Sequence, residues 1–206
     1  MNSIKLSKFL GKIKTKQKTN LNLSYSPSHV LKIEPGNILA NLRLGKIYQN
    51  KTLSYEPAIE CYERIIKADP AYFKAFYQLG LVYIEKKENK KALDHFKESL
   101  KINPKFSPSY KAIGHILSGA GNVSNAIRYY QKGLELDPSD YEGKVGYANC
   151  LFMDGSIDEA INVYLELIQI EDTDDIRYEY CFTLFKLHIN VFVIMKPNSM
   201  LISLLI

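Results

Sequence analysis

The chain has 206 residues and a formal net charge of +5, and this length allows one or two domains. Its three cysteines, Cys61, Cys150 and Cys181, are isolated and odd in number, and none stands close to a histidine as in a metal site. This pattern excludes a disulfide framework and indicates a reducing compartment. We interpret the three cysteines as small, buried core residues.

The positive charge is concentrated near the start of the chain. No acidic residue precedes Glu34, whereas seven lysines do, namely Lys5, Lys8, Lys12, Lys14, Lys16, Lys18 and Lys32. Without these lysines the remainder has a formal charge of about −2. The pI of 8.9 therefore describes a tail and not a nucleic-acid-binding body.

We interpret residues 1–36 as a basic, disordered tail with one degenerate helix, which Val30 and Leu31 indicate and Pro27 limits in length. Lysines interrupt the apolar run that a secretory signal needs. The residues that could share one face of a short helix are Leu6, Phe9, Leu10 and Ile13. Such a helix resembles a mitochondrial presequence or could touch an anionic membrane surface. We predict a cytoplasmic protein, with mitochondrial import as the alternative.

A repeat of fixed length organises the rest of the chain. Asp69-Pro70, Asn103-Pro104 and Asp137-Pro138 each follow a run rich in Leu or Ile, and successive prolines are 34 residues apart. Proline cannot continue a helix interior, so each pair ends one helix and begins the turn to the next. This period is typical of a solenoid of paired helices.

Small residues recur in phase with these prolines. They are Gly45, Gly80, Gly114 and Ala148 in the first helix of each unit, and Ala58, Ala92, Ala126 and Ala160 in the second. Minimal side chains let two helices approach closely where they cross, and large Tyr and Phe residues fill the space between. The first unit has one extra residue, which we place in the turn around residues 50–54. Ser139 and Glu142 have the spacing of a capping box at a helix start.

These residues resemble the tetratricopeptide repeat (TPR) family over about Asn37 to Asp172. The resemblance implies an all-α fold, a right-handed antiparallel helical solenoid of about four TPR units plus a partial fifth. The implied domains are the tail at 1–36, the solenoid at 37–172, and at 173–206 the partial fifth repeat with an apolar C-terminal segment. The apolar segment, 189–206, has three open interpretations: a truncated or misread terminus, a cap on the last repeat, or a membrane tail.

The resemblance also implies a function, the non-catalytic binding of a peptide or helix of a partner protein in a concave groove lined by the first helices. The candidate groove residues are Lys46, Lys74, Tyr77, Leu81, Lys111, His115, Val145, Asn149 and Phe152. Exposed apolar side chains among them would mark a partner site. Members that bind chaperone tails need Lys and Asn where this chain has Leu42 and Lys46, so a carboxylate clamp is not predicted.

A detached regulatory arm of an O-linked N-acetylglucosamine transferase-like enzyme is the alternative function. Such arms have a ladder of asparagines, whereas Asn149 stands alone in the middle of the predicted lining. The four histidines are too far apart for metal-ligand spacing, so we expect no catalytic, cofactor or metal site. The expected partners are other proteins, and neither a small-molecule substrate, a nucleic acid nor a membrane is expected.

Overall fold

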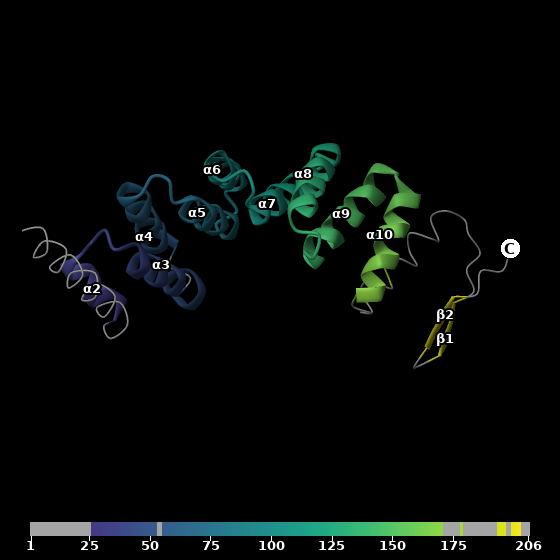
Figure 1. Ribbon diagram of the computed structural model, residues 1–206, viewed down its shortest axis with the longest axis horizontal. Coiled ribbons are helices and arrows are strands. Elements are labelled where there is room, and N and C mark those ends of the chain that lie inside the picture. The colour runs from purple at the N-terminus through teal and green to yellow at the C-terminus, as the bar shows by residue number, and fades with distance from the viewer. Residues whose placement is uncertain (1–25, 53–54, 171–177, 179–192, 197–198, 203–206) are drawn as a thin grey trace, which may run out of the picture. The chain divides into compact units, whose positions relative to one another are not determined.

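The computed structural model describes residues 26–52, 55–170, 178, 193–196 and 199–202 (Figure 1). The chain divides into two compact units, Met1–Pro104 and Lys105–Ile206, each with its own core. The predicted disordered tail before residue 26, most of the predicted partial fifth repeat and much of the apolar C-terminal segment lie outside the described residues.

Between residues 26 and 104 the described part of unit 1 contains a short leading helix and two helix pairs. Its elements are α2 (Pro27–Ile33), α3 (Ile38–Ile47), the π-helix η1 (Tyr48–Thr52), α4 (Tyr55–Ala68), α5 (Phe73–Glu85) and α6 (Asn89–Ile102). Helix α3 packs against α4 and α5 packs against α6, while α4 and α5 join the two pairs. Helix α2, with Pro27 in its first turn, packs on α3 and precedes the first pair.

Unit 2 contains two further pairs and a short hairpin. Its elements are α7 (Ser107–Gly119), α8 (Val123–Leu136), α9 (Tyr141–Asp154), α10 (Ile157–Ile170), β1 (Val193–Lys196) and β2 (Ser199–Ile202). The strands are antiparallel, with Val193 opposite Ile202. In the described parts of the chain, four helix pairs confirm the predicted all-α repeat, and the hairpin is an addition that the repeat pattern does not predict.

The ends of the second helices follow from the Asp/Asn-Pro pairs. Helices α4, α6 and α8 end at Ala68, Ile102 and Leu136, each directly before one of these pairs. The residue before a proline is driven out of the helical region, and Asn103 and Asp137 have φ values of −129° and −140°. The sequence pattern therefore predicts these helix ends to the residue.

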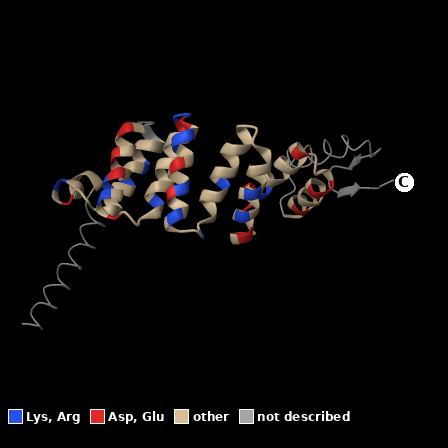
Figure 2. Cartoon of the chain, turned by 90° about the horizontal axis from the view of Figure 1, so that it is seen from above, with Lys and Arg blue, Asp and Glu red and all other residues tan. Residues whose placement is uncertain are grey.

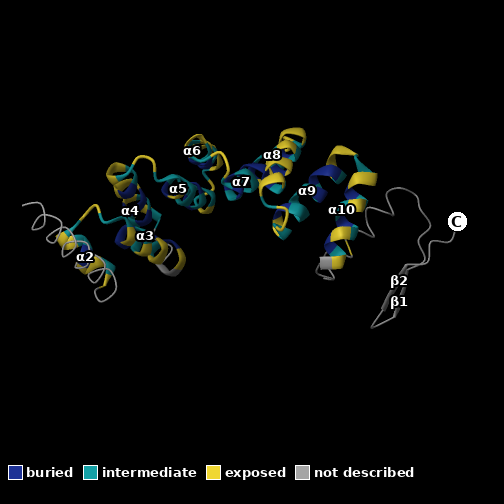
Figure 3. Ribbon diagram, in the orientation of Figure 1, coloured by how far each residue is buried: buried dark blue, intermediate teal, exposed yellow. Residues whose placement is uncertain are grey.

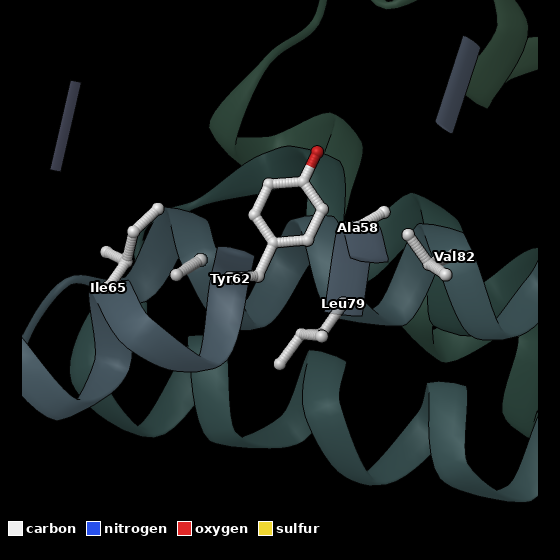
Figure 4. Close-up of a cluster of buried hydrophobic side chains, with 6 residues drawn as sticks. Ala58, Tyr62, Ile65, Leu79 and Val82 are labelled. Atoms are coloured by element: carbon white, nitrogen blue, oxygen red, sulfur yellow. The ribbon is translucent and has the colours of Figure 1, made fainter. Parts of the chain in front are cut away.

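The cores lie where the helices of each pair cross, as the burial colours in Figure 3 show. A Cβ on Gly80 would lie 2.4 Å from the Phe96 ring, and one on Gly45 would lie 2.8 Å from the Tyr62 ring. Ala58, Ala92, Ala126 and Ala160 are fully buried. Figure 4 shows Tyr62 beside Ala58, Leu79 and Val82 in the core of unit 1. The small residues stand at helix crossings because the aromatic rings occupy the remaining space.

Two local details concern the turns. A π-helix, η1, lies between α3 and α4, next to the turn where the sequence places the extra residue of the first unit. A π-turn holds one more residue than an α-turn, so it is a suitable place to accommodate that residue. The predicted capping box at Ser139 is wrong, because Asp140 is the N-cap residue of α9. The Ser139 hydroxyl instead donates to Asp137 Oδ1 at 2.7 Å, so the serine stabilises the preceding turn.

Candidate partner-binding faces on the first helices

In unit 1 the predicted groove residues lie on α3 and α5. The side chains of Lys46 on α3 and Lys74 on α5 are exposed, and Tyr77 and Leu81 on α5 are half-buried. The Tyr77 ring is tilted against Phe96 of α6, with 5.6 Å between the ring centroids. Tyr77 therefore contributes to packing within its pair and still offers part of its surface to solvent.

Hydrogen bonds among three polar side chains connect the first helix pair to the second. Gln49 Nε2 donates to Glu85 Oε1 at 2.6 Å, and the Tyr62 hydroxyl donates to Gln49 Oε1 at 3.3 Å. Gln49 is only 5% exposed, and burial raises the pKa of Tyr62, so this hydroxyl stays a neutral donor. These hydrogen bonds hold the Glu85 carboxylate in place at the end of α5.

In unit 2 the predicted groove lysine has intramolecular partners. Lys111 Nζ on α7 lies 2.9 Å from Asp140 Oδ1 and 3.0 Å from Glu142 Oε2, at the start of α9. Partial burial alone would lower the pKa of Lys111, but the hydrogen bonds to the two carboxylates outweigh it and leave this pKa raised. Lys111 therefore ties two first helices together, and its charge is already neutralised.

The other predicted residues of unit 2 divide into packed and exposed ones. Val145 and Phe152 pack against the core cluster around Ala148 and Tyr164. The Asn149 side-chain oxygen accepts a hydrogen bond from the Tyr164 hydroxyl, whereas His115 on α7 is exposed. The structure thus assigns Val145, Phe152 and Asn149 to holding α9 on α10 and leaves His115 at the surface.

Two exposed apolar residues lie on α3 next to the predicted face. Leu39 is 41% exposed and Ile47, which is absent from the predicted groove, is 37% exposed. Together with Arg43 they follow the spacing i, i+4, i+8, so they share one side of the helix. The spacing of Leu39, Arg43 and Ile47 is visible in the sequence and could have indicated this exposed stripe. An isoleucine at position 47 is equally compatible with a buried core position, however, so the sequence alone does not identify it.

Reactive chemistry has little support among the described residues. No group of three His, Cys, Asp or Glu side chains could hold a metal ion in the part of the chain that the structure describes. Cys61 and Cys150 are buried free thiols, as predicted, and burial raises the pKa of each thiol. A raised pKa keeps a thiol protonated and unreactive. Cys181 lies outside the described residues.

His95 on α6 belongs to an aromatic cluster. Its ring stacks on Tyr83, with 5.2 Å between centroids and 5° between planes, and Phe76 lies 6.5 Å away. Burial lowers the pKa of His95, so the neutral imidazole is favoured at neutral pH. The arrangement is that of a packed side chain between α5 and α6.

None of the helices that the structure describes is both long enough and apolar enough to cross a membrane.

Consecutive helix pairs, with an Asp/Asn-Pro pair after α4, α6 and α8, define the class of protein as a helical repeat protein. Three family models, all described as tetratricopeptide repeat, match residues 39–72, 73–106 and 117–180. Together these matches cover well over half of the sequence, and the chain belongs to the tetratricopeptide repeat family. The small residues and prolines correctly predict the repeat, and membership of the family supports a protein-binding scaffold, as the resemblance implies.

Solved TPR structures share this fold. YrrB, described as a TPR protein with an unusual peptide-binding site, is 20% identical, with a TM-score of 0.68 over 80% of this chain and 84% of its own. MamA is 24% identical, with a TM-score of 0.63 over 71% and 85% of the two chains. An O-GlcNAc transferase mutant of Thermobaculum terrenum is 19% identical, with a TM-score of 0.58. Here 64% of this chain aligns with 26% of the transferase. A comparison with curated proteins found no match.

Proposed function

We propose that this chain is a non-catalytic scaffold that binds a peptide or a helix of a partner protein along its first helices. The observation that carries this proposal is the face of unit 1, where Lys46 and Lys74 are exposed and Tyr77 and Leu81 offer part of their apolar surface. Cations beside partly exposed aromatic and aliphatic side chains suit a segment that has apolar anchors and polar flanks. The peptide-binding site named for YrrB supports peptide recognition by this fold.

Unit 1 carries the greater share of this proposed binding. In unit 2, Lys111 is held by Asp140 and Glu142, and Val145 and Phe152 are partly used in the core. A partner would have to break these contacts before it could use the same side chains, and such reorganisation reduces affinity. His115 then serves as a peripheral contact.

The test is peptide selection on the full chain from a displayed random library, followed by titration of the selected peptides. The variant Lys74→Glu/Tyr77→Ala is expected to weaken binding by about tenfold or more, as for loss of an anchor worth over 1.4 kcal/mol. Lys97→Glu, at an exposed position of the second helix α6, is the control and should leave affinity unchanged. Circular dichroism checks that each variant is folded. Equal affinity of wild type and the double variant for every selected peptide would exclude this face.

A second candidate is the regulatory arm of a glycosyltransferase-like enzyme, which the fold similarity to the Thermobaculum terrenum enzyme favours. The environment of Asn149 gives this candidate less support, because its side-chain oxygen is taken by Tyr164. The measurement is transferase activity towards protein substrates with and without this chain added. A change in substrate choice would favour the arm, and no change would favour the independent scaffold.

A further inference from the structure

The two units carry opposite formal charge. Residues 26–104 contain 13 Lys and Arg against nine Asp and Glu, which gives +4. Residues 105–170 contain five Lys and Arg against eight Asp and Glu, which gives −3. Figure 2 colours these charges on the helices. Unlike units of two copies therefore attract one another, whereas like units repel.

The positive partner surface lies on α3. The exposed stripe of Leu39, Arg43 and Ile47 combines two large apolar side chains, 41% and 37% exposed, with a cation. Lys46 borders the stripe, and α3 contains no acidic residue. Exposed apolar side chains that share one helix face are typical of a contact surface.

The complementary surface lies on α10. This helix contains three acidic residues and no basic residue. Asp158 and Glu159 are exposed, whereas Glu166 is paired with Lys144 of α9 at 3.1 Å. Asp158 lies on the same side of the helix as Ile161 and Leu165, which are half-buried, because the spacings are i+3 and i+7. Ile161 and Leu165 also pack against the core cluster of unit 2, so only part of their surface faces solvent. The exposed carboxylates of Asp158 and Glu159 are the feature of α10 that complements the cations of α3.

We propose that copies of this chain associate head to tail, with the exposed face of α3 in one copy against α10 in another. Such a contact is heterologous: one copy keeps its α10 surface unused and the other keeps its α3 surface unused, so further copies can add at both ends. The contact is small and has exposed ion pairs, so we expect weak association that salt suppresses. It does not require the peptide binding proposed above.

The test measures weight-average mass of the full chain by sedimentation velocity over a range of protein concentrations. At about 0.1 M salt the mass should rise above the 23.6 kDa of one chain, and at about 1 M salt it should stay near that value, because screening shortens to about 3 Å. The head variant Arg43→Glu/Lys46→Glu and the tail variant Asp158→Lys/Glu159→Lys should each remain monomeric. The matched control Lys90→Glu/Lys97→Glu, on α6, should still associate.

An equimolar mixture of the head and tail variants provides the decisive measurement. The native α3 of the tail variant can then bind the native α10 of the head variant, and the acidic α3 of the head variant complements the basic α10 of the tail variant, so association should return in the mixture. A monomeric wild type at all concentrations would overturn the proposal, as would association that survives the head substitutions or a mixture that stays monomeric. Association that is lost after nuclease treatment would assign it to bound nucleic acid and overturn the proposal too.

Discussion

Gly80 shows how one residue determines the distance between two helices. The Cβ of an alanine here would lie 2.4 Å from Cε1 of Phe96, a fully buried ring. We predict that Gly80→Ala lowers the free energy of unfolding by about 1–2 kcal/mol, since overpacking outweighs the gain in helix propensity. Urea denaturation of the full chain measures this change.

Two variants make the measurement specific. Gly119→Ala is the control, because nothing lies within 4 Å of the added Cβ and only helix propensity changes, by up to about 1 kcal/mol in the stabilising direction. Phe96→Leu in the Gly80→Ala background should recover part of the loss by making room. Additive effects of the two substitutions would contradict the contact between Gly80 and Phe96.

Lys87 occupies a turn position at which the two following repeats have glycine. Its φ is +61°, and Gly121 and Gly155, 34 and 68 residues further on, have φ values of +75° and +91°. A lysine in this left-handed conformation is strained, whereas glycine is not. We predict that Lys87→Gly raises the free energy of unfolding by about 0.5–1 kcal/mol, and that the converse Gly121→Lys lowers it by a similar amount. Thermal denaturation measures both, and a lower midpoint for Lys87→Gly would contradict the strain.

His95 makes stability depend on pH in a defined direction. Burial lowers its pKa in the folded state, with smaller opposing effects from Asp94, Glu63 and Glu98. The unfolded chain therefore binds the proton more readily, so stability is present above the unfolded pKa of about 6.5 and falls as the pH drops below it. We predict that His95→Phe, which keeps a ring beside Tyr83, removes this part of the pH dependence. If wild type and His95→Phe lost the same free energy of unfolding between about pH 6.5 and 5, the assignment of this pH dependence to His95 would be contradicted.

At the scale of elements, Lys111 links α7 to α9. Asp140 is mostly buried, with 13% of its side chain exposed, whereas Glu142 is 82% exposed. We predict that Lys111→Met lowers the free energy of unfolding by about 1–2 kcal/mol, because it leaves the Asp140 carboxylate without its cation. Glu142→Gln should cost less than about 0.5 kcal/mol, as expected for an exposed ion pair. Equal effects of the two substitutions would show that burial of Asp140 does not matter.

The helices were predictable from the sequence because several local signals agree. The Asp/Asn-Pro pairs fix the ends of α4, α6 and α8, and the Gly and Ala positions fix the faces that cross. The capping box failed because α9 begins one residue later than the pattern assumes, with Asp140 and not Ser139 at the N-cap. The strands β1 and β2 were not predicted, since a short apolar run fits a strand as well as a buried helix.

The groove residues were harder to predict. Alignment with the repeat pattern indicates which face of its helix a residue occupies, but it does not indicate which side chains that residue contacts. Lys46 and Lys74 are exposed, whereas Lys111 is paired with two carboxylates from a helix about 30 residues away. Val145 and Asn149 face contacts on α10 that depend on the packing of that pair. Sequence spacing defines the helix face, and the neighbouring helices determine what remains accessible on it.

At the scale of the whole molecule, an average over the sequence hid an important feature. Without its first seven lysines the chain has a formal charge of about −2, and this small value alone suggests that positive and negative charges are evenly distributed along the helices. The division at residue 104 shows instead that the helices before it carry excess positive charge and those after it excess negative charge. Charge patterning therefore becomes informative only once the units are known.

The division into two units also predicts which helices a destabilising substitution affects. In a repeat protein each helix pair is stabilised by its own core and by its neighbours, so destabilisation is local. The cores of unit 1 and of the α9–α10 pair consist of different residues. We predict that Gly80→Ala lowers hydrogen-exchange protection of backbone amides in α3–α6 and leaves protection in α9 and α10 unchanged.

Native-state hydrogen exchange followed by mass spectrometry measures this at the level of single helices. Gly146→Ala in α9 is the reciprocal variant, because its Cβ would lie 2.5 Å from the Tyr130 hydroxyl, and it should lower protection in α8–α10 alone. If either substitution reduced protection evenly from α3 to α10, the chain would unfold as one cooperative block. Independent responses would instead mean that a partner bound to unit 1 stabilises that unit without ordering the other.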